Sequence, residues 1–441
     1  MRDSQGEVTS PSMATAGGPS FGEVVATFAR IGCLSFGGPA GQIALMHRVL
    51  IEEKRWVDEE SYLGALNFCM LLPGPEAMQL ATWVGWKLHG VRGGLAAGLL
   101  FVLPGALVML VLSALYAAFG AVPLVTALFL GIKAAVLAIV VEALMRVAKR
   151  ALKGRLDWMI AGAAFVGIYF LGVAFPLIVI AAALLGFFRG GSGDRAAVRP
   201  AGVPMLQTAR TAAIWLGVWL VPLIVLALVA GRDHVLSELA WLFSKLAVVT
   251  FGGAYAVLAY MGQEVVQQYG WLSPGEMLDG LGLAETTPGP LILVLQFVGF
   301  LAALRQGGEP AALIAVAGAI VTLWATFAPC FLWIFTGAPY LAQISAEPRL
   351  KQALAAVTAA VVGVILNLTV WFSINVLFAR VGETQYGPLR VMLPDPTSLN
   401  LPATGLAALA FVLLFAAHRG IVTVLAVASV GGLVLHHLGA V

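Results

Sequence analysis

The sequence Ser35-Phe36-Gly37-Gly38-Pro39 is followed along the chain by Pro73-Gly74-Pro75, and both patterns occur a second time. The same gapless shift that places Phe36 on Phe251 also places Gly252-Gly253 and Pro288-Gly289-Pro290 on their counterparts. About a quarter of the aligned pairs between 28–75 and 243–290 are identical. Internal repeats that carry Gly/Pro breaks within apolar segments are typical of secondary transporters whose site lies between two halves.

The composition predicts an integral membrane protein. Of the 441 residues, 60% are hydrophobic and 11% are charged, whereas soluble domains carry roughly a quarter charged residues. About 20 helical residues cross the hydrocarbon core, so the long apolar stretches predict an all-α polytopic protein with roughly 10–13 membrane elements. These stretches are 94–118, 121–145, 156–188, 211–230, 310–335, 351–378 and 403–437.

The loops that follow the two FGG motifs differ in charge. The first contains Arg48, Lys54 and Arg55, whereas its counterpart at 263–271 contains no Lys or Arg. Lys and Arg are concentrated in cytoplasmic loops, so the two copies are expected to face opposite sides of the membrane. The sequence therefore predicts an inverted-topology repeat with broken or re-entrant helices.

The chain divides into four parts by composition. Residues 1–20 are rich in Gly, Ser, Thr and Pro and predict a disordered tail. A first repeat is expected at 21–188, and a basic, Gly-rich cytoplasmic linker at 189–210. The second repeat is expected at 211–441, with an extra span at 211–230 that supplies the odd crossing needed for the inversion.

The four breaks are the candidate substrate site. Non-helical backbone at membrane depth is tolerated only where it is buried in protein or lines a polar cavity. Broken helices leave unpaired amide donors at their N-termini, and such donors bind anions. Hydroxyls and carboxamides nearby suit oxyanion contacts, although Ser and Thr in membrane helices often bond to their own backbone carbonyls. The candidate residues are Ser35, Gly37, Gly38, Pro39, Pro73, Gly74, Pro75, Gln79, Thr250, Gly252, Gly253, Thr287, Pro288, Gly289, Pro290 and Gln296.

Several charged residues fall within or beside these segments. Arg30 and Lys245 occupy matching positions of the repeat and are candidate charge partners of a bound anion; the alternative is that they extend to the interface from helix ends. Lys133 stands alone in an apolar run and is a further candidate for proton coupling or for an ion pair. The carboxylates of Glu76 and Glu285 do not match across the repeat, and each could couple transport to protons or form an ion pair.

The motifs resemble those of the chromate ion transporter family, in its long form with two fused homologous domains. The resemblance rests on Phe28 to Gln42, Leu72 to Gln79, Phe251 to Tyr255, and Glu285 to Phe300. It implies export of chromate from the cytoplasm, driven by the proton-motive force, across the inner membrane of a bacterium.

The residues by themselves predict an anion site and do not select chromate. Sulfate is also a tetrahedral dianion, so a carrier or channel for sulfate or another oxyanion is the alternative. A membrane-embedded enzyme would need a catalytic constellation, and the sequence contains no catalytic, cofactor or metal-ligand motif. The expected partners are the anion and the lipid bilayer, with no nucleic acid; whether two copies form a homodimer is left open.

Overall fold

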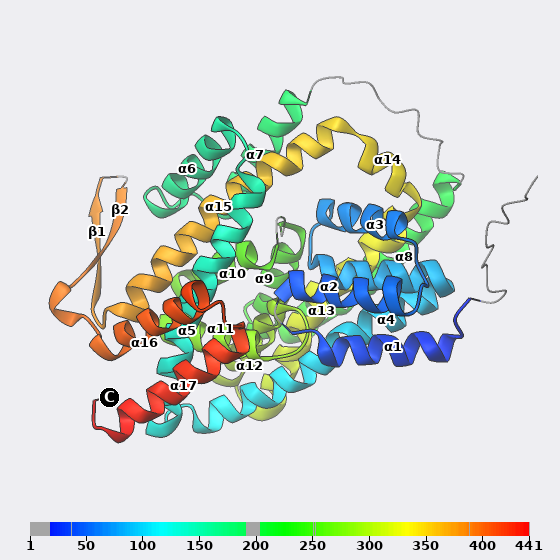
Figure 1. The fold of residues 1–441 in the computed structure, drawn as a ribbon. Helices are drawn as coiled ribbons and strands as arrows, with labels where there is room; N and C mark the ends of the chain where they lie inside the picture. The colour runs from blue at the N-terminus through cyan, green and yellow to red at the C-terminus, as the bar shows by residue number, and fades with distance from the viewer. Residues whose placement is uncertain are drawn as a thin grey trace, which may run out of the picture.

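The protein is a helical bundle in which long apolar helices predominate (Figure 1). The computed structural model describes residues 18–36, 38–190, 203–249, 251, 253–387 and 389–440. Within these residues, five helical stretches are long and apolar enough to cross a membrane. They are α4 (Glu76–Phe119), α5 (Pro123–Ala151), α8 (Met205–Ala230), α13 with its continuation (Ala311–Ile344) and α15 (Pro348–Leu377). The predicted all-α polytopic membrane fold is therefore confirmed.

The duplicated sequence folds into duplicated structure. The first copy begins with α1 (Phe21–Leu34), α2 (Gly38–His47), the π-helical turn η1 (Arg48–Glu53), α3 (Glu59–Leu71) and the start of α4. The second copy repeats this order with each boundary at the matching position or within one residue of it. Its elements are α9 (Val235–Val249), α10 (Ala254–Gln263), η2 (Glu264–Gln268), α11 (Pro274–Thr286), the 3-10 turn η3 (Leu291–Leu293) and α12 (Val294–Gln306).

Even the turns between these helices repeat. The Lys54 amide donates to the Val49 carbonyl at 3.0 Å, and at the matching place the Tyr269 amide donates to the Glu264 carbonyl at 2.9 Å. The central glycines of the two PGP motifs, Gly74 and Gly289, have φ of +115° and +92°. Only glycine adopts this region without strain, so it is required at the centre of each break.

The remaining elements also recur. In the first copy α4 contains a non-helical pair, His89 and Gly90, which separates its first turns from its long second part. That second part corresponds to α13 (Ala311–Gly337), and each contains one internal proline, Pro104 and Pro329. The hairpin of α6 (Arg155–Tyr169) and α7 (Phe175–Arg189) corresponds to α16 (Leu401–Phe411), extended by η6 (Val412–Ala416), and α17 (Ile421–His437).

The second copy carries insertions that the first lacks. The short turns η4 (Ala338–Tyr340) and α14 (Leu341–Ala346) precede α15. An antiparallel hairpin of β1 (Val381–Tyr386) and β2 (Leu389–Pro394), followed by the turn η5 (Pro396–Ser398), separates α15 from α16. The hairpin projects from one end of the bundle (Figure 1).

The helix hairpins are exchanged between the copies. The α6–α7 hairpin of the first copy packs on α15 of the second, and the α16–α17 hairpin of the second packs on α5 of the first. Glycines permit these close crossings: a Cβ on Gly131 of α5 would lie 2.0 Å from the Ala428 carbonyl oxygen, and one on Gly186 of α7 would lie 2.7 Å from the Ala353 Cα. The two halves therefore share one hydrophobic core.

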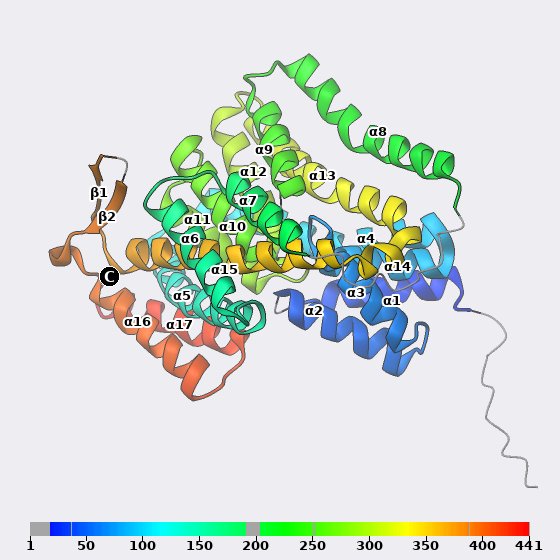
Figure 2. The same ribbon diagram turned by 90° about the horizontal axis from the view of Figure 1, so that it is seen from above.

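Helix α8 connects the halves and lies at the edge of the bundle, beside α9 and α13 (Figure 2). It is held by indole hydrogen bonds: Trp219 donates to the Ala325 carbonyl at 3.1 Å, and Trp324 donates to the Trp219 carbonyl at 3.2 Å. Most of its remaining apolar surface is uncovered by protein. A single helix with an apolar exposed face suits contact with lipid.

The structure refines several sequence-based boundaries. The apolar stretches 156–188 and 403–437 each form a pair of short helices, because Gly172 and His418 turn the chain at positive φ. The last part of the predicted linker is helical, since α8 begins at Met205, while 191–202 lie outside the described residues. The hairpin at β1–β2 was not anticipated.

Residues 1–17 of the predicted tail also lie outside the described residues. Ser20 caps α1, because its hydroxyl accepts a hydrogen bond from the Glu23 amide at 3.3 Å.

Replacing Gly131 with valine is expected to destabilise the protein, because the new side chain would collide with backbone of α17. Overpacking of a tight core site costs about 1–3 kcal/mol or more. Gly162→Val on α6 is the matched control, since a Cβ there meets nothing within 4 Å. Thermal unfolding in detergent would measure both, and equal unfolding temperatures for the two variants would contradict the proposed close crossing.

Candidate functional site

The first FGG break meets the second PGP break at the centre of the molecule. The Gly289 amide donates to the Ser35 carbonyl at 2.8 Å. The Gln42 carboxamide spans the same junction, because its Nε2 donates to the Gly289 carbonyl at 2.6 Å and lies 3.4 Å from the Ser35 carbonyl. Gln42 is only 1% exposed. The backbone groups freed by the two breaks are thus satisfied by each other across the repeat, as buried polar groups require.

The second FGG break lies beside the first PGP break in a corresponding way. Glu76 directly follows Pro75 and begins α4. A Cβ placed on Gly253 would lie 3.9 Å from the Glu76 carboxylate oxygen Oε1. Each PGP element therefore contacts the FGG element of the other copy.

One cavity collects residues from all four breaks. It has room for about one water molecule, at roughly 10 Å³. A tetrahedral oxyanion does not fit into this volume, so the described conformation is one in which the breaks are closed on one another. The lining residues are Pro39, Gln42, Pro75, Glu76, Ala77, Ala254, Pro290, Leu291 and Ile292.

The long helices support the PGP elements from the opposite copy. A Cβ on Gly105 of α4 would lie 2.0 Å from the Pro288 carbonyl oxygen, and one on Gly74 would lie 3.1 Å from Cys330 Sγ of α13. Gln79 Nε2 donates to the Pro73 carbonyl at 2.7 Å. The carboxamide oxygens of Gln79 and Gln296 are buried and accept no hydrogen bond from the described residues.

The hydroxyls near the breaks are engaged by their own helices. Ser35 donates to the Ile31 carbonyl at 2.7 Å, and Thr287 donates to the Leu283 carbonyl. This is the alternative that the sequence left open for Ser and Thr. Three candidate residues, Gly37, Thr250 and Gly252, lie outside the described residues.

The structure does not bring Arg30 or Lys245 to the cavity. Arg30 Nη1 lies 3.9 Å from the Glu53 carboxylate, and Lys245 Nζ lies 3.8 Å from Glu264. Their side chains are 61% and 38% exposed. The helix faces that carry Arg30 and Lys245 point away from the breaks, so both cations lie beside carboxylates of the π-helical turns. Neither residue lines the cavity.

Lys133 has a buried partner. Its Nζ lies 3.2 Å from Asp279 Oδ1, and Tyr116 donates to Asp279 Oδ2 at 2.8 Å. The Lys133 and Asp279 side chains are 21% and 8% exposed. This network joins α4, α5 and α11 and satisfies a charge that would be costly alone in the membrane.

Charged groups on α5 face the carboxylates of the breaks. Glu285 is buried and accepts a hydrogen bond from Tyr255 at 2.8 Å. Arg146 and Glu142, which are 2.6 Å apart, act electrostatically on Glu285, and Arg150 acts on Glu76. Both arginines lie on the last turns of α5 and are exposed.

Sequence reasoning missed several of these residues. Gln42 follows Pro39 of the first motif by three residues, so its place beside a break was an available signal. Arg146 and Arg150 belong to the basic run 146–155, a pattern that by itself indicates only a cytoplasmic loop. Gly105 and Asp279 carried no local signal, because their roles arise from contacts between distant segments. Among the described residues, no three His, Cys, Asp or Glu side chains are grouped as metal ligands.

Comparison with known proteins agrees with this duplicated arrangement. The family described as "Chromate transporter" matches residues 22–187 and 237–433, most of the chain. The chain belongs to the chromate transporter family. Among its relatives, a chromate transport protein of Pseudomonas aeruginosa is 34% identical over 80% of each chain. A chromate transport protein of Cupriavidus metallidurans is 30% identical over 81% of this chain and 84% of the relative.

A third relative is similar over a comparable share of the chain. The probable chromate transport protein of Synechococcus elongatus is 29% identical over 78% of this chain and 82% of its own. No solved structure matches the chain. The membership of the chromate transporter family points to a transporter rather than an enzyme.

Proposed function

We propose that this protein is a secondary active transporter that exports chromate from the cytoplasm across the inner membrane of a bacterium, and so confers resistance to chromate. The observation that carries the proposal is the cavity lined by residues of all four breaks. The substrate is proposed from the relatives, which are chromate transport proteins. The cavity supplies a place where one anion would contact both halves at once.

The chemistry of the breaks suits an oxyanion. When the PGP and FGG elements separate, the Gly289 amide loses the Ser35 carbonyl and the Gln42 carboxamide loses the Gly289 carbonyl. Both groups then become donors for anion oxygens. Arg150, on the last turn of α5, acts electrostatically on Glu76 and would offset part of the charge of a dianion, whereas Arg146 already pairs with Glu142 at 2.6 Å. Arg30 and Lys245 are not part of this proposal, because each has a carboxylate partner.

The electrical part of the proton-motive force favours export of a dianion. Moving one elementary charge through the membrane potential yields about 2.3 kcal/mol per 100 mV, and two negative charges leaving an inside-negative cell therefore gain about 4.6 kcal/mol per 100 mV. Glu76 would repel the dianion when ionised and would admit it when protonated; if that proton leaves with the anion, one net negative charge is exported and the electrical gain is about 2.3 kcal/mol per 100 mV. Proton coupling is thereby assigned to Glu76, with Glu285 as the second carboxylate.

We also propose that the two copies are inverted in the membrane. Supporting this, α5 ends in the basic segment Arg146–Arg155, whereas its counterpart α15 begins beside Arg189 and Arg349 and ends at the β-hairpin. If the Lys/Arg-rich end is cytoplasmic, the two equivalent helices run in opposite directions. The breaks of the two copies would then open toward opposite sides.

Everted membrane vesicles test the function directly. With the protein present, we expect labelled chromate to accumulate inside when the membrane is energised, and a protonophore to abolish the accumulation. Excess sulfate separates the alternatives: a general oxyanion carrier would lose chromate accumulation in its presence. Accumulation that follows an imposed membrane potential but does not respond to an imposed pH gradient at zero potential would indicate a channel and would contradict the proposal.

Replacing Gln42 with leucine is expected to lower chromate accumulation about tenfold or more, because loss of a buried hydrogen-bond partner costs about 1–3 kcal/mol. Gln306→Leu is the matched control, since Gln306 is exposed at the end of α12. Both variants would be assayed in everted vesicles at equal protein abundance. Parent-like accumulation by Gln42→Leu would remove the junction from the substrate pathway.

A further inference from the structure

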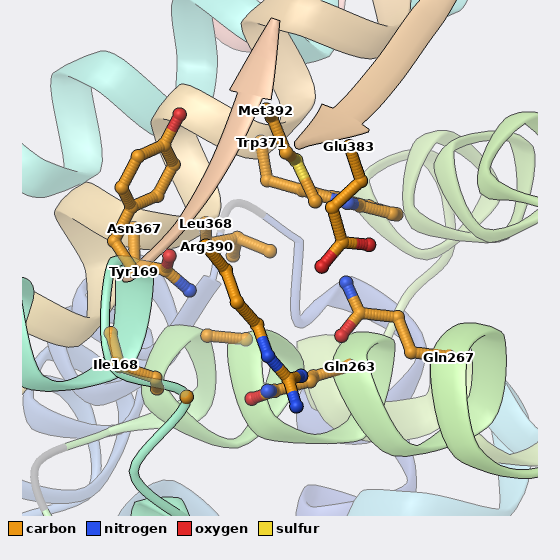
Figure 3. Close-up of a pocket in the computed structure, with 12 residues that line it drawn as sticks. Ile168, Tyr169, Gln263, Gln267, Asn367, Leu368, Trp371, Glu383, Arg390 and Met392 are labelled. Carbon is orange, nitrogen blue, oxygen red and sulfur yellow. The ribbon is translucent and has the colours of Figure 1, made fainter. Parts of the chain in front are cut away.

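A second and larger pocket lies away from the breaks, beneath the β-hairpin (Figure 3). It has a volume of about 50 Å³ for water-sized molecules, five times that of the central cavity. Its walls come from the end of α6, the end of α10, the middle of α15 and the inner face of the hairpin. Nothing in the proposed central mechanism uses this pocket.

The hairpin is fixed over the pocket by the turn between α6 and α7. The Arg390 amide donates to the Phe170 carbonyl at 2.8 Å. At Gly172, where φ is +61°, a Cβ would lie 3.6 Å from the Arg390 guanidinium. The pairing of Glu383 with Met392 and of Gln385 with Arg390 places these four side chains on one face of the hairpin. Arg390 is thus held at the pocket by its own backbone.

The polar side chains in the pocket lack partners. Gln263, Gln267, Asn367 and Arg390 line it; Gln267 and Arg390 are exposed to solvent, Gln263 and Asn367 are half-buried, and within the described part of the chain no protein group hydrogen-bonds to or forms an ion pair with these four side chains. In Figure 3, Arg390 extends toward Gln263 on α10, and Glu383 extends toward Gln267. By contrast, Arg380 of the same hairpin pairs with Asp395 at 3.0 Å. A planar guanidinium beside free carboxamides is a donor set that fits an oxyanion.

Helix α10 connects the two cavities. Ala254 at its first turn lines the central cavity, and Gln263 at its last residue lines the pocket. Nine residues of helix separate them, a rise of about 14 Å. Helix α10 is therefore one element that borders both cavities.

We propose that the hairpin pocket is a second binding site for a small tetrahedral oxyanion, with Arg390 as its main ligand and with Gln263, Gln267 and Asn367 as further donors. Its place on the route of chromate rests on the proposed function; its capacity to bind an oxyanion does not. Glu383 sets the affinity low, because its negative charge lies in the same pocket and favours release. The pocket would be the last binding site that the anion occupies before it enters solution.

Purified protein in detergent, titrated with chromate and separately with sulfate, tests the binding. Arg390→Gln is expected to weaken one class of sites about tenfold or more, since it removes a charge-assisted fork. Glu383→Gln is expected to raise the affinity of the same class of sites several-fold, because glutamine keeps the size of the side chain and removes a negative charge that repels the anion. Binding to this class should also weaken as salt is raised.

Two controls separate binding from folding. Arg380→Gln removes a cation from the same hairpin outside the pocket and should leave the affinity unchanged. Arg390→Lys keeps the positive charge but loses the planar guanidinium, so its anion affinity should lie between those of the parent and of Arg390→Gln. Unchanged binding in Arg390→Gln, or weaker binding in Glu383→Gln, would overturn the proposal. Loss of anion binding on addition of anionic phospholipid would assign the pocket to a lipid headgroup and would also overturn it.

Failure of the central proposal would look different. Gln42→Leu should leave the hairpin class of sites intact, because Gln42 lies at the other cavity. If vesicles show no chromate transport while Arg390-dependent binding persists, the proposed function fails and the pocket stands. If transport occurs and Arg390→Gln changes neither binding nor the rate of release, the pocket fails alone.

Discussion

Replacing Glu76 with glutamine is expected to uncouple chromate movement from pH. Two unit charges about 4 Å apart interact by roughly 4 kcal/mol at an effective dielectric constant near 20, so an ionised carboxylate in the central cavity strongly opposes a dianion. Glutamine resembles the protonated acid in shape and carries no charge. At alkaline pH the variant should therefore bind chromate about tenfold or more tightly than the parent.

The measurement uses everted vesicles with an imposed membrane potential and no pH gradient, over a series of pH values. The parent should lose accumulation as the pH rises, whereas Glu76→Gln should stay nearly constant. Glu52→Gln is the control, because Glu52 is 60% exposed on η1 beside His47. An unchanged pH profile in Glu76→Gln, together with a flat profile in Glu285→Gln, would move the proton site to Glu285.

Replacing Lys133 with methionine is expected to cause the largest loss of stability. The substitution leaves Asp279 buried with Tyr116 as its remaining partner, and breaking a buried ion pair by removing one member costs about 3–5 kcal/mol. The double variant Lys133→Met with Asp279→Asn should recover most of this loss, since asparagine still accepts from Tyr116 without a charge. Thermal unfolding in detergent would report both.

Lys87→Met is the matched control for Lys133→Met. Lys87 lies 3.4 Å from Asp58, but these side chains are 36% and 64% exposed, and such pairs contribute about 1 kcal/mol or less. Equal destabilisation by Lys87→Met and Lys133→Met would contradict a special role for the buried pair. A double variant no more stable than Lys133→Met would show that the lost interaction is packing and not charge.

The repeat made much of the fold predictable. Gly74 and Gly289 stand at positive φ in breaks that the PGP motifs indicated, and the helices around them begin and end at matching residues. The motifs carry this information locally, because proline and glycine restrict the backbone wherever they occur. The membrane class followed from composition alone.

Other features depended on contacts that no local pattern records. Arg30 and Lys245 match across the repeat, yet each pairs with a carboxylate on the following π-helical turn. A duplicated charge is therefore as compatible with a duplicated ion pair as with a binding site. The β-hairpin was missed because it belongs to an insertion in one copy, where the repeat offers no second example to compare.

The exchange of helix hairpins has a consequence for biosynthesis. The α6–α7 hairpin leaves the ribosome long before α15, the helix on which it packs. Helix α5 is likewise synthesised long before α16 and α17, which pack on it. During synthesis the first half must therefore remain in the bilayer with its interior faces covered by lipid or by the insertion machinery. Assembly is completed only when the last helices arrive, so a chain that stops before them leaves the first half without the surfaces that enclose it.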